Sequence, residues 1–286
     1  MSAAWLVNQN SKRPPVRYLG GKWALAPWII GFFPPHTHYV EPFCGGASML
    51  FRKHASEIET INDLDEEVIN FFRMLRERPR ELLRAVALTP YARRELALAC
   101  EPPVADPLER ARRFIVRSRM AYGLRQRHNT GWRYITNSHG RGPRLAREWS
   151  DPRGLEFAVK RLRQVQVECD DASAVIRRYD TPKTLFYVDP PYVLSSRSET
   201  RQMYLYEMTD DQHRELAALL NSVRGMVVLS GYRSALYDEL YAGWPRFDRV
   251  VPNNGNSTSV ECVWVSPRAA HVQAMPLFSL VKGGAV

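Results

Sequence analysis

The 286-residue chain has little of what marks disulfide-rich, membrane or nucleoside-triphosphate-binding proteins. Its four cysteines, Cys44, Cys100, Cys169 and Cys262, lie far apart with no Cys-x-x-Cys pair, which excludes a disulfide framework and a typical zinc site. The most apolar stretch, 23–33, is too short to span a membrane and contains a proline. The sequence has no P-loop, no Gly-x-Gly-x-x-Gly and no signal-peptide pattern. We therefore expect a soluble cytoplasmic protein.

Lysine is also scarce, because 34 of the 40 basic residues are arginine. Fifteen of the 40 lie in residues 110–163 beside only three acids, so this segment carries a net charge of +12 and the rest of the chain −2. A GC-rich genome can explain the arginine-to-lysine ratio, but it does not explain the segregation. Arginine suits phosphate and guanine edges, and the basic block predicts a nucleic-acid surface.

Strand and helix patterns alternate on both sides of the basic block, which predicts an α/β fold. Strands are expected at 38–43, 57–63, 164–169, 184–189, 225–231, 247–251 and 259–265. Helices are expected at 66–76, 80–88, 91–100, 107–121, 152–162, 171–179, 209–222 and 234–241. Aromatic and polar runs on both sides of Asn129-Thr130-Gly131 predict a hairpin or long basic loop over 122–142. The expected domains are a catalytic sheet, 1–65 and 164–286, and an inserted, mainly helical module, 66–163.

Asp189-Pro190-Pro191-Tyr192 directly follows an apolar strand. Ligands in open α/β sheets bind at the carboxyl ends of the strands, and these residue types suit chemistry on an exocyclic amine. The Asp189 carboxylate and the Pro190 carbonyl can accept the two amine hydrogens, while consecutive prolines restrict the backbone. Tyr192 can stack on a base that has left the duplex. The alternative is an ordinary Asp-Pro turn at a strand end.

This motif and five further segments, in the same order, resemble the D12 (Dam-like) class of DNA adenine-N6 methyltransferases. The segments are RYLGGK at 17–22, EPFCGGA at 41–47, INDLD at 61–65, Asp171 and VVLSGY at 227–232. The resemblance implies a Rossmann-like sheet, S-adenosylmethionine as methyl donor without a metal, and a flipped adenine in double-stranded DNA as substrate. It also implies a bacterial or phage-encoded enzyme of restriction–modification or epigenetic regulation. Whether the enzyme is a monomer or a homodimer is left open by the sequence.

Matching positions in these segments are the candidate cofactor-binding residues: Tyr18, Lys22, Glu41, Pro42, Phe43, Cys44, Gly45, Gly46, Asp63, Asp171 and Asp189. Gly45 and Gly46 allow close backbone approach to a ligand, and Asp63 lies near the spacing at which an acid meets a ribose hydroxyl. Asp65 and Asp170 are competitors, since acids at these positions can also cap helices. Ala47 stands where the family has a glycine, and we expect Gly46 to supply the missing flexibility.

The basic module supplies the candidate DNA-binding residues. We expect arginines on the helix near 107–121 to divide between phosphate contacts and a solvated face, and loop residues to reach base edges. The candidates are Arg117, Arg119, Arg125, Arg127, Asn129, Trp132, Arg133, Asn137 and His139. Two alternatives stay open: an N4-cytosine DNA methyltransferase, and a catalytically inactive DNA-binding regulator on the same fold.

Overall fold

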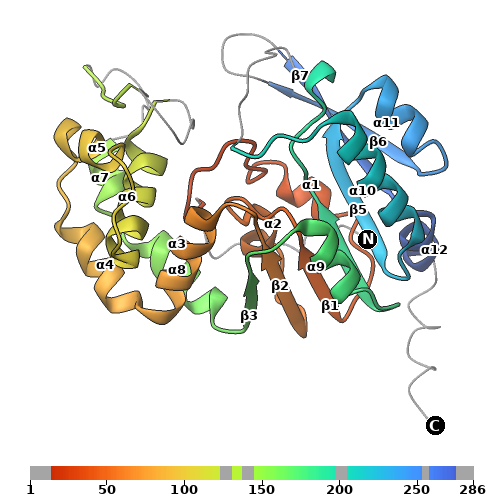
Figure 1. Cartoon of the computed structure of the whole chain (residues 1–286), viewed down its shortest axis with the longest axis horizontal. Helices are drawn as coiled ribbons and strands as arrows, with labels where there is room; N and C mark the ends of the chain where they lie inside the picture. The colour runs from red at the N-terminus through yellow and green to blue at the C-terminus, as the bar shows by residue number, and fades with distance from the viewer. Residues whose placement is uncertain (1–13, 123–130, 137–144, 197–204, 253–257, 275–286) are drawn as a thin grey trace.

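The structure, a computed structural model, describes residues 14–122, 131–136, 145–196, 205–252 and 258–274. Over these residues seven strands form one sheet in the order β3-β2-β1-β4-β5-β7-β6 (Figure 1). The strands are β1 His38–Glu41, β2 Ile58–Asn62, β3 Val165–Glu168, β4 Thr184–Val188, β5 Met226–Tyr232, β6 Arg246–Pro252 and β7 Thr258–Val265. Strands β1 to β5 pair in parallel, and β7 runs antiparallel to β5 and β6. The expected Rossmann-like α/β fold is confirmed.

The strand order reverses between β1 and β4. From β1 the chain proceeds outward to β2 and β3, and it then returns to place β4 on the other side of β1. Val40 of β1 is therefore aligned with Thr60 of β2 on one side and with Phe186 of β4 on the other. Such a switch point leaves a crevice outside the carboxyl ends of the two central strands, where ligands bind in open α/β sheets.

Apolar side chains cover both faces of the sheet, because helices pack against each face. In β4, Leu185 and Tyr187 join one core, and Phe186 and Val188 join the other, as the two-residue period of a strand requires. The first core includes residues of α1 Ala26–Ile30, α2 Ser48–Arg52 and α12 Pro267–Ala274. The second includes residues of α9 Ala172–Arg178, α10 Asp210–Ser222 and α11 Ala235–Leu240. These cores fix the strand ends that carry the site.

In the sequence, a helical segment is inserted between β2 and β3. In space it stands to one side of the sheet (Figure 1). Its helices are α3 Glu66–Glu77, α4 Pro79–Leu88, α5 Arg93–Ala99, α6 Pro107–Met120, α7 Leu145–Trp149 and α8 Arg153–Leu162. Helix α6 packs against α3, α4 and α5. Helix α3 packs against both parts of the molecule. The ring centre of Phe72 lies 6.1 Å from that of Phe51 in α2, which covers the sheet, and the ring centre of Phe71 lies 5.1 Å from that of Phe114 in α6.

After α6 the chain returns beside itself in an antiparallel arrangement. Ala121 forms an antiparallel bridge with Trp132, and the Arg133 N–H donates to the Met120 carbonyl at 2.8 Å. The other residues expected to form the hairpin, 123–130 and 137–142, lie outside the described residues. In the part of the chain that the structure describes, no helix has the length and apolar character needed to cross a membrane.

Candidate active site

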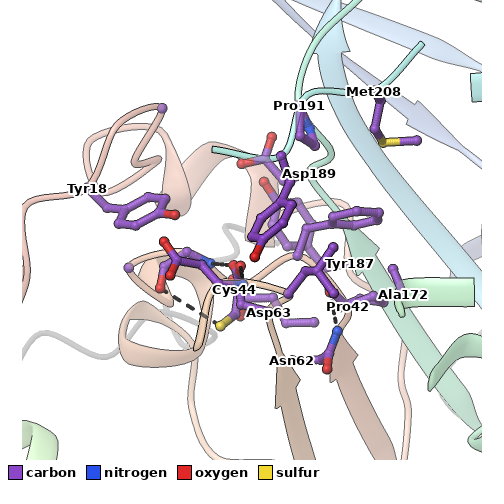
Figure 2. Close-up of a pocket in the computed structure, with 18 of the residues that line it drawn as sticks. Tyr18, Pro42, Cys44, Asn62, Asp63, Ala172, Tyr187, Asp189, Pro191 and Met208 are labelled. Atoms are coloured by element: carbon purple, nitrogen blue, oxygen red, sulfur yellow. Dashed lines mark hydrogen bonds between the residues drawn. The ribbon is translucent and has the colours of Figure 1, made fainter. Parts of the chain in front are cut away.

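A cavity of about 300 Å³ opens at the carboxyl ends of β1, β2 and β4, at the switch point of the sheet (Figure 2). Residues from the N-terminal segment, the turn after β1, the end of β2, the start of α9 and the segment after β4 line it. All eleven candidate cofactor-binding residues are among them. Of the four candidate catalytic residues, Asp189 and Pro191 also line the cavity, and Pro190 and Tyr192 are not among its described lining residues.

The cavity is strongly acidic although the chain as a whole is basic. Its described lining residues include one lysine, Lys22, and eight acidic side chains: Glu41, Asp63, Asp65, Asp170, Asp171, Asp189, Glu207 and Glu215. A concave site lined by charges of one sign raises the local concentration of oppositely charged ligands. The cavity therefore favours a cationic ligand or one that presents several hydrogen-bond donors.

Asp63, which follows the end of β2, is hydrogen-bonded to the Gly45 turn after β1. The Asp63 carboxylate accepts the Gly45 N–H at 2.8 Å and the Asp65 N–H at 2.9 Å. Burial, the largest cause, and the nearby Asp65 charge raise the pKa of Asp63 to about 6, although these N–H groups oppose the shift. Gly45 has φ +45°, and a Cβ there would lie 2.7 Å from the Tyr18 ring. The glycine is required because its backbone lies against this ring.

The last position of this turn differs from the expectation. Ala47 itself takes the left-handed conformation, with φ 50° and ψ 41°, and Gly46 is not among the described residues with positive φ. The expectation that Gly46 supplies the flexibility is therefore wrong. A Cβ on Gly46 would lie 2.9 Å from the Tyr18 Cβ, so this glycine serves close approach instead. Ala47 adopts a conformation that costs an L-residue about 1–2 kcal/mol.

The competing acids have different hydrogen-bond partners. Asp65 caps α3 by accepting the Glu67 N–H, and Asp171 caps α9 by accepting the N–H groups of Ser173 and Ala174. The Asp170 carboxylate pairs with Arg178 at 2.8 Å, and Asn62 holds its backbone N–H and carbonyl. Asp171 thus combines the two roles that the sequence left open, since it caps a helix and lines the cavity.

Glu41 and Cys44 form the inner wall of the cavity. Glu41 is 2 % exposed and accepts hydrogen bonds from the Tyr39 hydroxyl at 3.0 Å and the Leu50 N–H at 3.3 Å. Burial raises its pKa to about 8. Burial also raises the pKa of the Cys44 thiol well above its usual value, so this cysteine is a neutral wall residue rather than a nucleophile. In the described residues no group of three His, Cys, Asp or Glu side chains could hold a metal ion.

Both oxygens of the Asp189 carboxylate are held in place at the end of β4. The Ser230 hydroxyl of β5 donates to Oδ1 at 2.8 Å and is itself hydrogen-bonded to the Tyr187 hydroxyl. The Lys22 ammonium lies 3.0 Å from Oδ2. Carboxylate oxygens that are fixed in this way present their remaining lone pairs in a defined direction, which suits the positioning of an amine.

Tyr192 is not among the described lining residues, but it contacts β5, β7 and the lining residue Lys22. Its hydroxyl donates to Glu261, its ring meets the Tyr232 ring at 4.7 Å, and the Lys22 ammonium lies 4.8 Å from its ring centre. Sequence reasoning missed Glu261 and Ser230. The signal for Glu261 was an acid in an otherwise apolar strand, SVECVWV, where an unpaired carboxylate would be costly.

The arginines of α6 that the structure describes have partners within the protein, either acids or backbone carbonyls. Arg112 pairs with Glu95 and Glu109, and Arg117 pairs with Glu67 at 3.5 Å and donates to the Ala99 carbonyl. Their side chains are 15 % and 17 % exposed, so the expected solvated face is wrong for them. Arg119 donates to the Pro15 carbonyl at 2.9 Å.

Of the remaining candidate DNA-binding residues, the structure describes Trp132 and Arg133, which lie in the antiparallel return after α6. Arg133 donates to the Arg119 carbonyl, and Trp132 stacks on Tyr134 at 5.9 Å with the Arg93 guanidinium 4.9 Å from its ring centre. The others lie outside the described residues: Arg125, Arg127, Asn129, Asn137 and His139.

An Asp-Pro-Pro-Tyr sequence that brings a fixed carboxylate to the switch point of an α/β sheet, beside an acidic cavity, is the arrangement of an amino-methyltransferase. The chain belongs to the D12 class of N6 adenine-specific DNA methyltransferases, because the model of that family matches residues 18–254. The adenine interpretation is thereby confirmed, and the cytosine alternative is not supported. Use of S-adenosylmethionine follows from the family.

Individual relatives are named as methyltransferases or methylases, and two of the following three names specify adenine. The chain is 27% identical over 253 residues to the Type II methyltransferase M1.LlaDCHI of Lactococcus lactis subsp. cremoris. The alignment covers 82% of this chain and 86% of that protein. It is 24% identical over 246 residues to the DNA adenine methylase of Salmonella typhi, covering 81% and 85%. The DNA N-6-adenine-methyltransferase of Escherichia phage P1 is 24% identical over 227 residues, 76% of this chain and 29% of that protein.

Proposed function

We propose that the cavity binds S-adenosylmethionine and that Asp189 and Pro190 hold the N6 amine of an adenine extruded from double-stranded DNA. The observation that carries the proposal is the place of Asp189, whose fixed carboxylate meets an acidic cavity at the switch point of the sheet. The family makes the same assignment of substrate base.

The residues of the cavity fit this cofactor in charge and shape. S-adenosylmethionine supplies a methyl group on a positively charged sulfur, and carboxylates suit that charge, the ammonium group and the ribose hydroxyls. The Tyr18 ring, which lies against Gly45 and Gly46, offers a flat apolar surface at the mouth of the turn. In this proposal Asp63 and Asp171 receive hydroxyl or amine hydrogens, and Glu41 lines the floor.

Asp189 and Pro190 act on the amine through hydrogen bonds. The Asp189 carboxylate accepts one amine hydrogen and the Pro190 carbonyl accepts the other, which directs the nitrogen lone pair at the methyl carbon. Bound S-adenosylmethionine would supply the methyl group and would keep the electron pair of its carbon–sulfur bond on sulfur. The proton displaced from the amine would pass to the Asp189 carboxylate, which already accepts its hydrogen bond, and from there to water. The rigid Pro190-Pro191 backbone keeps both acceptors in place, and Tyr192 provides the ring on which the base stacks.

The helical segment 66–163 is proposed as the DNA-binding module, inserted in a catalytic domain of residues 1–65 and 164–286. The residues proposed to reach the DNA are Arg125, Arg127, Asn129, Asn137 and His139. Trp132 and Arg133, which belong to the same segment, are proposed to contribute to the same surface. Arg117 and Arg119 support this surface, because their guanidinium groups bind protein carbonyls or carboxylates. Because its substrate is DNA, we propose that the enzyme acts in the cytoplasm.

The proposal is tested by expressing the chain in a methylation-free bacterium and sequencing modified bases in its genome. We expect N6-methyladenine in one fixed sequence context, and N4-methylcytosine in its place would overturn the proposal. Asp189→Ala should abolish methylation while calorimetry still shows S-adenosylmethionine binding and duplex DNA still binds. Asp211→Ala, which changes an exposed aspartate of α10, is the matched control. Normal methylation by Asp189→Ala would disprove the assigned role.

A further inference from the structure

Glu261 is a buried acid whose described partners both belong to the candidate active site. It lies on β7, directly across from Tyr232 of β5, and is 4 % exposed. Its carboxylate accepts the Tyr192 hydroxyl and lies 3.6 Å from the Lys22 ammonium. Burying a carboxylate costs several kcal/mol unless partners compensate, so a carboxylate in this apolar strand depends on those two groups.

Lys22 lies between two carboxylates. Its ammonium is 3.0 Å from Asp189 Oδ2 and 3.6 Å from Glu261 Oε1, and it also donates to the Gly20 carbonyl at 2.7 Å. It lies over the Tyr192 ring, 4.8 Å from the ring centre. Lys22 is therefore paired with Asp189, the carboxylate proposed to receive the target amine. It also lies over Tyr192, the ring proposed to stack on the base.

The second carboxylate gives this ammonium an alternative partner. Ser230 already donates to Asp189 Oδ1 and the Lys22 ammonium lies 3.0 Å from Oδ2, so an amine that approaches Oδ2 meets the lysine there. A small movement of the lysine toward Glu261 would keep its charge compensated while it opens Asp189 Oδ2 to the amine. The same glutamate holds the hydroxyl end of Tyr192 and thereby fixes the tilt of its ring.

We propose that Glu261 is a positioning residue of the methyl transfer: it anchors Tyr192 and receives the Lys22 ammonium when the target adenine binds Asp189. This inference rests on the proposed function, since it assigns the base to Asp189 and Tyr192. It requires a carboxylate at this position. A glutamine could still accept the Tyr192 hydroxyl, but it could not compensate the charge of the lysine.

Glu261→Gln separates these roles. We expect kcat to fall about 10- to 100-fold, as for loss of a buried charged hydrogen-bond partner, with the Kd of S-adenosylmethionine changed less than about 3-fold. Duplex DNA carrying 2-aminopurine at the target position should show a weaker rise in fluorescence, because the lysine stays on Asp189 and hinders entry of the base. Adding Lys22→Met to Glu261→Gln should restore part of the fluorescence rise, since the competing ammonium is gone.

Glu59→Gln is the matched control for burial. Glu59 is 2 % exposed and pairs with Lys53 and Arg161, but it is not among the described residues that line the cavity. The Glu59→Gln substitution should lower the melting temperature and leave the kcat and the fluorescence rise unchanged. If Glu261→Gln keeps a kcat and fluorescence rise within about twofold of the wild type, or if Lys22→Met restores nothing in its background, the inference is wrong. Normal methylation by Asp189→Ala would instead mean that the proposed function has failed.

Discussion

The Ser118 hydroxyl donates to the Arg17 carbonyl at 2.8 Å and accepts the Arg17 N–H at 2.9 Å. Ser118 belongs to α6 of the helical segment, whereas Arg17 directly precedes Tyr18 and its contacts with the glycine turn. Arg119 adds a third bond across the same junction by donating to the Pro15 carbonyl. The helix that leads into the basic loop thus holds the N-terminal segment that carries Tyr18 and Lys22.

Ser118→Ala should loosen this junction. Loss of the two side-chain bonds should lower the free energy of unfolding by about 1–3 kcal/mol, measured by urea denaturation. The KM for S-adenosylmethionine should rise about 3- to 10-fold because Tyr18 is less firmly placed. Ser222→Ala, in which an exposed hydroxyl also bonds a backbone carbonyl, is the control and should change neither quantity. An unchanged KM would show that the junction is structural only.

The raised pKa of Asp63 predicts pH-dependent cofactor binding. Its charged form accepts hydrogen bonds, and its pKa of about 6 means that the carboxylate becomes protonated as the pH falls through that value. The Kd of S-adenosylmethionine should therefore rise by up to about 10-fold per pH unit below about pH 6, and level off above about pH 7. Calorimetric titrations at a series of values between about pH 5 and pH 7.5 measure this Kd.

Asp63→Asn provides the comparison for that titration. An amide at this position does not titrate, so the variant should bind more weakly at about pH 7.5 and show a nearly flat profile down to about pH 5. The neighbouring Glu41, with a pKa of about 8, titrates above this window and does not produce the same step. A flat profile in the wild type, or an unchanged step in the variant, would contradict the role of Asp63.

We expect different roles for Arg117, which pairs with Glu67, and Arg127 of the basic segment. Removing the inward-facing Arg117 leaves Glu67 with one partner fewer, so Arg117→Ala should lower the free energy of unfolding by about 2–3 kcal/mol without changing the salt dependence of DNA binding. Arg127→Ala should leave stability within about 0.5 kcal/mol. It should either reduce the salt slope by about 1 or cost about 1–3 kcal/mol of discrimination at one base position. Urea denaturation and fluorescence anisotropy over a salt series separate these outcomes.

The longer elements could be predicted from local patterns. Apolar runs that end at turn residues predicted all seven strands, and the apolar period of 66–76 predicted α3, which spans Glu66–Glu77. The helices α1, α7 and α12 were not predicted. Each has eight residues or fewer, and helices this short depend largely on packing against the rest of the fold. Helices α9 and α11 are as short but were predicted, and a capping side chain, Asp171 or Ser234, begins each of them, whereas α1 has no such cap.

The candidate cofactor residues were predictable because each follows a strand. Gly45, Asp63 and Asp189 lie just after β1, β2 and β4, and parallel strands bring their carboxyl ends to one edge. Ser230 and Glu261 could not be assigned in this way, because their role depends on how β5 and β7 are placed beside β4. The conformation of Ala47 was also missed, since the surrounding structure imposes φ 50° on a residue that rarely adopts it by itself.

Local patterns along the chain were enough to predict the order of elements, the edge of the sheet where the site lies, and the segregation of basic residues into 110–163. How that charge is used depends on the folded arrangement. Arg112 and Arg117 fold back onto Glu95 and Glu67, which precede the basic segment in sequence, so part of its charge is compensated within the protein. Charge counted along a chain ignores distance in space, whereas ion pairs depend on it, and only folding sets those distances.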